Sequence, residues 1–423
     1  MLLSLQSLLG LGLIVGLAWL LSENRRRVAW KAVAVGLALQ ALLAWPLLNL
    51  EGARAVFAVL NDAVNALDAA TREGTAFVFG YVGGAEAPFL TKENTSSFVL
   101  AFQALPLILV VSALSALFFH WGLIQPVVKG FAWVLRRTLG VSGPAGVACA
   151  MEVFVGMTES PLVVRPYLRS ESRAALFVIM TAGMATVSGT VMVLYATFLN
   201  PIVPNALGQI LTASIINVPA AIVIAFVMIP EDPARAALPG DGTALIAGGE
   251  PGDNMMSVIA RGTVDGIQLV MNVVAMLIVL VALVSLANMV IGLLPDVAGA
   301  PLTLQRMFGW ALAPLAFCLG LPWSEIPTAG ALLGTKTVLN ELIAYIEMSR
   351  LPAEALSERS RLILTYALCG FANFSSLGIA IGGLGAMVPE RRAEIVALAP
   401  KALISGTLAT CLTGALVGVL VHA

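Results

Sequence analysis

Long uninterrupted apolar runs are the feature that most constrains this sequence. The first extends from Leu2 to Leu21, and a second covers roughly Val28–Leu50. A run of about 20 apolar residues is long enough to cross a bilayer as a helix. In the whole chain 11% of the residues are charged, whereas a soluble globular domain has about 25%. With 59% hydrophobic residues, the sequence predicts an all-α integral membrane protein.

The charge and the reactive side chains exclude several classes of protein. The formal net charge is −1, which argues against a nucleic-acid partner. The four cysteines lie in apolar runs at unrelated spacings, so we expect core residues and not disulfides or metal ligands. The two histidines lie in different segments, which disfavours a histidine-based metal site or catalytic dyad. We expect no cofactor.

Basic clusters orient the predicted spans. The stretch SENRRRVAWK, residues 22–31, carries four cations between the first two spans, which places it in the cytoplasm and the N-terminus outside. The cluster follows the first apolar run, which is the reverse of a signal peptide. Arg137, Arg169 and Arg392 lie in clusters that fit the same orientation. The eight predicted spans cover residues 2–21, 28–50, 97–123, 174–199, 201–229, 256–294, 367–384 and 401–421.

Three segments differ from the spans. Residues 51–95 have mixed charge and are predicted to lie outside, with one short helix at most. After Gln125, basic and aromatic residues alternate at helical spacing, which predicts a helix in the membrane interface. Residues 231–254 are rich in Pro, Gly and Asp without periodicity, and they are predicted to form a linker.

An internal repeat relates residues 131–199 to residues 308–386. FAW near the start of the first copy matches FGW in the second, Glu159 matches Glu341, and SES at 170–172 matches SER at 357–359. Each copy then enters an apolar span broken by small polar residues. The first copy faces the cytoplasm where the second faces outward, so the repeat is inverted. Inverted repeats recur in secondary transporters, with the binding site at their interface.

Two carboxylates mark the first copy. Glu152 and Glu159 lie seven positions apart in the otherwise apolar stretch 151–166. Carboxylates inside a bilayer are costly and usually serve transport or proton movement. The alternative is a helix end or cap at the membrane surface.

Each copy is expected to contain a re-entrant helical hairpin. The segment Ser142–Arg169 must start and end at the cytoplasm, so we predict a hairpin there, called hairpin 1, with its tip at residues 155–160. Its outer counterpart, hairpin 2, covers about Ile326–Met348 with its tip near residues 339–341.

The two tips and the two broken spans should converge on one pocket. Lys336, one turn from Glu341, is expected only to pair with it, so the pocket suits an anion poorly. Carboxylates and amides bind hydroxyl groups, and an aromatic ring packs against a flat apolar group. The alternative for Asn373 and Ser376 is to satisfy backbone groups freed at a helix break. The predicted polar lining is Thr158, Glu159, Asn340, Glu341, Asn373 and Ser376, with Phe371 as an aromatic wall.

Almost the whole chain resembles the concentrative nucleoside transporters. The similarity lies in residues 151–166, in GTKTVLNELIAY at 334–345 and in CGFANFSSLGIAIGGLG at 369–385. It implies a homotrimer of elevator-type carriers with eight transmembrane helices, two re-entrant hairpins and interfacial helices. The implied scaffold comprises residues 1–124 and 255–302, and the implied transport domain comprises 125–230 and 303–423 on either side of the linker.

The resemblance also assigns roles to residues. Thr158 would contact the nucleobase, and Val191 and Phe371 would line the pocket. Met157 replaces the glutamine usual in this family, so recognition of the base should differ, because a thioether lacks the paired hydrogen bonds of an amide. The ribose hydroxyls would be held by Glu159, Glu341, Asn373 and Ser376.

The coupling ion is expected near Glu152. Sodium-coupled relatives have asparagine at this position, and their ion site corresponds here to Glu152, Thr186 and the carbonyls of Val155 and Val187. A carboxylate could still bind sodium, yet burial favours its neutral form, which favours proton coupling.

The sequence therefore predicts a carrier and not an enzyme. We expect secondary active import of nucleosides across a bacterial inner membrane, driven by a proton gradient, with a sodium-coupled symporter as the alternative. A carrier of modified nucleosides or nucleobases is also possible. A membrane-embedded hydrolase using Glu159 and Glu341, or a passive channel, is a weaker alternative.

Overall fold

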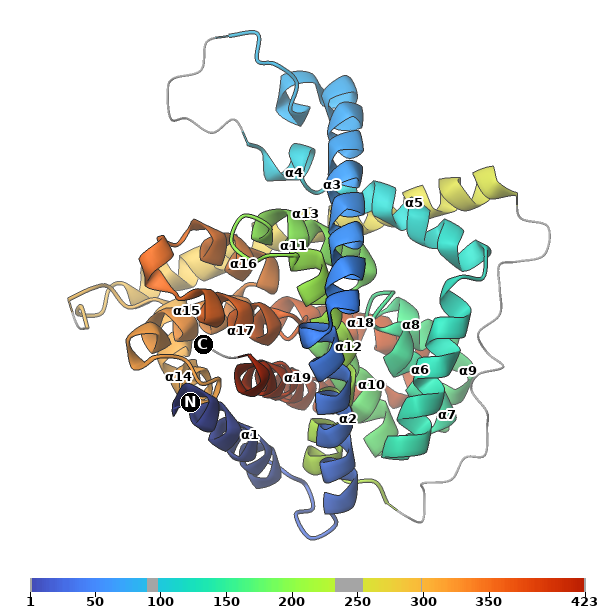
Figure 1. Cartoon of the computed structure of the whole chain (residues 1–423), viewed down its shortest axis with the longest axis vertical. Helices are drawn as coiled ribbons and strands as arrows, with labels where there is room; N and C mark the ends of the chain where they lie inside the picture. The colour runs from blue at the N-terminus through green and yellow to red at the C-terminus, as the bar shows by residue number, and fades with distance from the viewer. Residues whose placement is uncertain (1, 90–97, 233–253, 298, 422–423) are drawn as a thin grey trace.

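The computed structural model describes residues 2–89, 98–232, 254–297 and 299–421. Within these ranges the chain forms helices and no strand, apart from an isolated bridge between Val297 and Ala300 (Figure 1). The predicted linker at 231–254 lies almost entirely outside the described residues. The short 3₁₀ turns are η1 (Gly80–Gly83), η3 (Trp323–Glu325), η4 (Ala353–Ala355) and η5 (Pro389–Arg391).

The predicted spans are present as helices. Seven stretches of the described chain are long and apolar enough to cross a membrane. The eighth predicted crossing is a broken helix whose halves, α17 (Glu358–Leu368) and α18 (Phe374–Met387), are each shorter. The other seven are α1 (Leu2–Leu20), α2 (Trp30–Asn49), α4–α5 (Leu100–Gln103 and Leu107–His120), α10–α11 (Arg173–Ala185 and Gly189–Leu199), α12 (Ala206–Met228), α13 (Met255–Ile291) and α19 (Arg392–Leu420).

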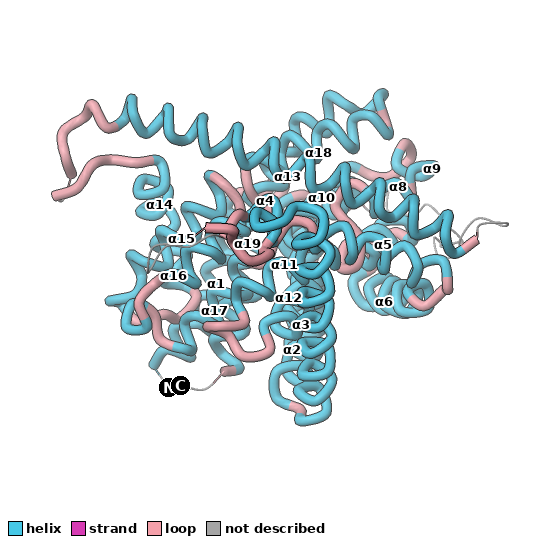
Figure 2. Tube along the Cα trace, turned by 90° about the horizontal axis from the view of Figure 1, so that it is seen from above, coloured by secondary structure: helices cyan, strands magenta, loops and turns pink. Residues whose placement is uncertain are grey.

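The expectation of one short helix at most in residues 51–95 is wrong, because α3 covers Glu51–Phe79. Its apolar and small polar residues recur every three or four positions, which gives one buried face on a charged helix. Phe57 on this face lies against Gly208 of α12. Figure 1 shows α3 continuing α2 as one rod, which Figure 2 shows foreshortened. The face comprises Phe57, Leu60, Val64, Leu67, Thr71 and Thr75.

Two helices begin earlier than predicted because their polar ends are paired. The crossing predicted from residue 367 begins at Glu358 as α17, in which Arg361 is buried. The Arg361 guanidinium donates to the carbonyls of Met348 and Pro352, at 3.2 and 2.8 Å. The span predicted from residue 401 begins at Arg392 as α19, with Pro400 inside it.

The predicted scaffold helices pack in two groups: α1 and α2 lie against α19 and α12, and α5 lies against α13. Helix α1 packs along α19 and α14 (Leu304–Cys318), and α2 packs along α12. Helix α5 packs along α13, which Figure 2 shows lengthwise across the molecule. The first two helices thus lie against the part predicted to form the transport domain. The division of the chain at residue 124 stays a prediction.

The two copies of the repeat have the same order of elements. In each, one helix precedes a hairpin and a broken helix follows it, as the sequence predicts. Serine caps the broken helices at corresponding positions, because Ser172 Oγ accepts from Ala175 N and Ser357 Oγ from Ser360 N. The first copy contains α6 (Ile124–Leu139), α7 (Gly143–Met151), α8 (Glu159–Val163) and α9 (Arg165–Leu168), and the second contains α14, α15 (Ile326–Val338) and α16 (Glu341–Arg350).

Candidate functional site

The two broken helices cross where they are unwound. Phe371 N donates to Thr186 O at 3.2 Å, which joins the break in α17–α18 to the break in α10–α11. Asn217 of α12 donates through Nδ2 to Ala185 O at 2.8 Å and to Cys369 O at 2.7 Å. These carbonyls are freed where the helices end. One buried amide therefore satisfies a carbonyl from each break.

Hairpin 2 places Glu341 at the crossing. Asn340 caps α16 by accepting from Ile343 N at 3.0 Å, so Glu341 is the first residue of that helix. The Glu341 carboxylate is buried and accepts from Tyr195 OH and from Asn373 Nδ2, the latter at 2.9 Å.

Asn373 orients this carboxylate and caps a helix at the same time. Its Oδ1 accepts from Ser376 N at 2.8 Å, which caps α18. The cap fixes the amide so that Nδ2 faces Glu341. The structure shows Asn373 capping the helix at the break and contacting Glu341, and its contact with substrate stays a prediction.

Lys336 does not pair with Glu341 as expected. Its ammonium is buried and donates to Ala367 O and to Thr410 Oγ1, both at 3.0 Å. These oxygens belong to α17 and α19, so Lys336 joins hairpin 2 to the core of the protein.

Hairpin 1 buries Glu152 next to a hydroxyl. The Glu152 side chain is 1% exposed, and Oε1 lies 2.7 Å from Ser160 Oγ. Ser160 Oγ also lies 3.0 Å from Ala148 O. Across the hairpin, a Cβ built on Gly183 of α10 would lie 3.3 Å from Glu152 Oε1 and 3.0 Å from the Met157 Cβ. Glycine at 183 thus allows the tip to approach α10 closely.

The tip of hairpin 1 also contacts α11 and α18. Gly189 N donates to Phe154 O at 3.2 Å. A Cβ built on Gly383 would lie 2.8 Å from Thr158 Cγ2. Glu159 and Val155 line a cavity of about 300 Å³ between this tip and helices α5, α6 and α13.

The structure brings the predicted residues into three adjoining groups. Glu341, Asn373 and Ser376 form the first, Glu152 and Met157 the second, and Thr186 and Phe371 the third. Val187 follows Thr186 in the break of α10–α11, and its backbone N lies 3.4 Å from Ser214 Oγ of α12. Thr158, Glu159 and Val155 lie at the tip between α18 and the cavity, and Val191 is buried in α11.

Three side chains of the candidate site were not singled out from the sequence. Ser160 lies at the end of the predicted tip of hairpin 1, and Tyr195 and Asn217 each lie in an apolar helix with no motif around them. The available signal was Asn217 near Pro219 inside an otherwise apolar span. A buried amide there needs hydrogen-bond partners.

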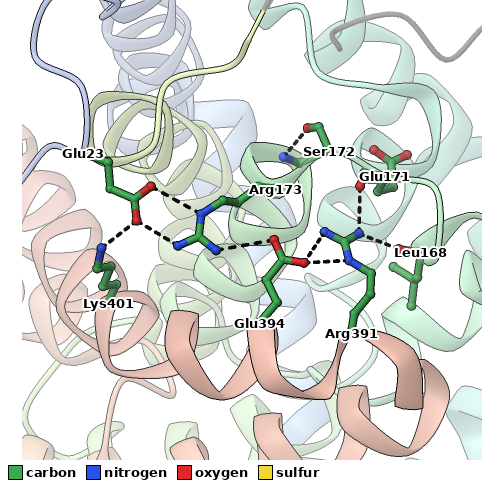
Figure 3. A network of polar contacts seen from close by, with 9 residues as sticks. Glu23, Leu168, Glu171, Ser172, Arg173, Arg391, Glu394 and Lys401 are labelled. Atoms are coloured by element: carbon green, nitrogen blue, oxygen red, sulfur yellow. Dashed lines mark hydrogen bonds and ion pairs between the residues drawn. The ribbon is translucent and has the colours of Figure 1, made fainter.

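An ionic network fixes the ends of the elements that carry the site (Figure 3). Glu23 in the α1–α2 loop accepts from Arg173 Nη2 at 2.9 Å and from Lys401 Nζ at 2.6 Å. Arg173 also reaches Glu394, which pairs with Arg391 at 2.8 Å. The hydrogen bond from Arg173 lowers the pKa of Glu23 to about 2, against the effect of burial, which raises it. Arg391 then donates to the carbonyl of Leu168 at the end of hairpin 1 and to that of Glu171 just after it.

This arrangement defines a class of protein. Two hairpins and two crossed broken helices, with buried carboxylates at their ends, are the architecture of a secondary transporter. Among the described residues, the breaks carry polar groups that face one another and not lipid.

Comparison with known proteins identifies the family. The model for the C-terminus of Na⁺-dependent nucleoside transporters matches residues 209–418, and the N-terminal model matches 9–82. A nucleoside-recognition model matches 101–202. The chain is 35% identical to an uncharacterized transporter of Haemophilus influenzae, covering 99% of this chain and 98% of that one. It is 31% identical to human sodium/nucleoside cotransporter 1, covering 98% of this chain and 64% of that one.

Solved structures agree with these matches. CNTnw in an inward-facing substrate-bound state superposes with a TM-score of 0.87 at 32% identity, covering 99% of this chain and 98% of that one. An outward-facing variant of the same protein gives 0.86. The chain belongs to the concentrative nucleoside transporter family. It is a multi-pass membrane transporter of nucleosides and not an enzyme.

Proposed function

We propose that this protein is a proton-coupled importer of nucleosides in a bacterial inner membrane, and that Glu152 carries the coupling proton. The observation that supports this most directly is the surroundings of the Glu152 carboxyl. It is 1% exposed, and the side chain that hydrogen-bonds to it is the Ser160 hydroxyl. An ionised carboxylate in such a place is costly unless a cation or several donors compensate it.

The single neutral donor at the Glu152 carboxyl favours its protonated form. A hydroxyl has one proton to donate, and Ser160 Oγ lies within hydrogen-bond distance of two acceptors, Glu152 Oε1 and Ala148 O. With Glu152 ionised, Ser160 donates to Oε1 and Ala148 O keeps its hydrogen bond from Glu152 N at 3.1 Å, so a buried charge is held by one neutral donor. With Glu152 protonated, its proton goes to Ser160 Oγ, and the serine donates to Ala148 O.

Sodium coupling is the second candidate. Thr186 Oγ1 donates to Ala182 O at 2.9 Å and keeps lone pairs for a cation. Sodium would then bind at Glu152 and Thr186 with the carbonyls of Val155 and Val187, and the carboxylate would supply the compensating charge.

The substrate is proposed to bind at the convergence of the two tips. Glu159, Glu341, Asn373 and Ser376 would hold the ribose, Thr158 and Met157 would contact the base, and Phe371 and Val191 would close the pocket. The Glu341 carboxylate is already held by Tyr195 and Asn373, so it is preorganised to accept from sugar hydroxyls. A homotrimer in the lipid bilayer, moving residues 125–230 and 303–423 against the rest, completes the proposal.

Uptake in proteoliposomes tests the coupling ion. Labelled uridine, cytidine and adenosine are offered while the pH gradient and the sodium gradient are varied independently. Proton coupling predicts accumulation driven by pH alone in the wild type, and its loss in Glu152→Gln with equilibrium exchange of nucleoside retained. The matched control is Glu73→Gln, an exposed glutamate of α3.

Three results would contradict the proposal. Accumulation that needs sodium at every pH would favour the sodium site. Persistent pH-driven accumulation in Glu152→Gln would remove Glu152 from coupling. Equilibration without accumulation would indicate a passive channel.

A further inference from the structure

A cavity lies between the tip of hairpin 1 and helices α5, α6 and α13, and its lining does not include Glu341. Its volume is about 300 Å³, at the lower end of the range for small-molecule sites. One wall is the tip of hairpin 1 with Glu159, next to Thr190 of α11. The opposite wall belongs to α5, α6 and α13, which include Ser115, Gln125 and Asp265.

Two side chains of the second wall have polar atoms without partners. Gln125 is 6% exposed, and its Nε2 donates to Phe119 O at 2.6 Å. Its Oε1 is buried and has no hydrogen-bond partner within the described ranges. The same is true of Nδ1 of His120, which lines the cavity as well. An unpaired buried acceptor costs about 1–3 kcal/mol, so a ligand or water that donates to it is favoured.

The lining selects the chemistry of the ligand. Gln125 Oε1 and the carboxylates of Glu159 and Asp265 accept hydrogen bonds, so the cavity favours a ligand rich in hydroxyl and amino groups. A phosphate would meet two carboxylates, with Arg261 as the cation on the same face of α13. The cavity therefore favours a nucleoside over its phosphate ester.

Glu159 connects this cavity with the proposed substrate site. It lies at the tip of hairpin 1, which contacts α18 through Thr158 and also lines the cavity. A nucleoside bound to Glu159 can therefore keep that contact while it leaves the Glu341 cluster and contacts the residues of α5, α6 and α13 that line the cavity.

We propose that the cavity is a second binding position for the nucleoside, in which Gln125 accepts from the substrate and His120 Nδ1 hydrogen-bonds to it while Glu159 retains it. This inference rests on the proposed binding of the sugar by Glu159. In this second position, residues outside the hairpins and the broken helices contact the substrate directly.

Protection of an introduced thiol tests the proposal. The four native cysteines are buried, so N-ethylmaleimide should report on Ser115→Cys in the full-length protein in proteoliposomes. Uridine or adenosine should slow alkylation, and uridine 5′-phosphate should not. Thr190→Cys on the opposite wall serves as a second reporter if Ser115→Cys does not fold.

Adding Gln125→Leu separates occupancy from a change of conformation. Loss of one neutral hydrogen bond should raise the half-protecting nucleoside concentration about two- to tenfold, and adding His120→Leu should raise it further. Gln268→Leu, an exposed residue of α13 outside the cavity, should leave it unchanged.

The outcomes distinguish this inference from the transport function. Nucleoside uptake without thiol protection overturns the second position alone, and so does protection that Gln125→Leu leaves unchanged. Absence of uptake by the wild type overturns both.

Discussion

Replacement of Glu23 by glutamine removes the centre of the ionic network in Figure 3. The carboxylate accepts from Arg173 and Lys401, which lie on α10 and α19. Its pKa falls from an ordinary value of 4.5 to about 2. At about 1.4 kcal/mol for each tenfold change, this would correspond to roughly 3 kcal/mol for fully shielded charges.

The expected effect is smaller because solvent reaches all three groups. The side chains of Glu23, Arg173 and Lys401 are 31%, 38% and 40% exposed, and exposed pairs contribute about 0.2–1 kcal/mol each. We therefore expect Glu23→Gln to lower the free energy of unfolding at pH 7 by about 1 kcal/mol. In a chain of this size that lowers Tm by about 1–2 °C.

The lowered pKa of Glu23 determines how its contribution to stability changes with pH. The folded chain depresses the pKa of Glu23, so its stabilisation is complete above about pH 4.5 and is lost as the pH falls toward 2. The Tm difference between wild type and Glu23→Gln should therefore shrink below pH 4.5 and also at high salt.

Thermal unfolding with a thiol-reactive dye measures this at pH 7, because all four cysteines are buried in the folded protein. At pH 3, where thiols are protonated and unreactive, scanning calorimetry measures it instead. Glu73→Gln is the matched control. Equal Tm values for wild type and Glu23→Gln at pH 7 would refute the reasoning, as would a difference that persists unchanged at pH 3.

Three further predictions concern the crossing of the broken helices. Asn217→Leu leaves the carbonyls of Ala185 and Cys369 unpaired at about 1–3 kcal/mol each, so Tm should fall by several degrees in the same dye assay. Glu341→Gln turns an amide donor toward Tyr195 or the Asn373 amide, so nucleoside affinity measured by calorimetry should fall about tenfold or more. Gly370→Ala would place a Cβ 2.7 Å from Ala185 O, so it should lower both Tm and uptake.

Each of these has a clear contrary result. An unchanged Tm for Asn217→Leu would mean that water replaces the amide. Full affinity in Glu341→Gln would remove this carboxylate from substrate binding. Normal Tm and uptake in Gly370→Ala would mean that the breaks separate more easily than their contact implies.

The sequence predicts the architecture well because its strongest signals are local. Uncharged apolar runs locate the spans, and the match of Glu159 with Glu341 locates both hairpins. The same reasoning missed α3, since its buried face is divided among residues such as Phe57, Val64 and Thr71 within a charged segment. The regular spacing of its buried residues, and not its overall composition, identifies such a helix.

The site was predicted less completely because its hydrogen bonds join residues that are far apart in the sequence. Lys336 is one turn from Glu341, yet it bonds to oxygens of α17 and α19. Tyr195 reaches Glu341 across 146 positions. Nothing within either segment indicates these partners.

The amide of Asn217 has a consequence for how the two repeats can diverge. Duplicated halves usually accumulate changes independently. Here one side chain, which belongs to neither hairpin nor break, donates a hydrogen bond to the unwound turn of each half. A backbone shift in one copy would pull that amide away from the other, so substitutions near either break should be tolerated only when they leave both carbonyl positions in place.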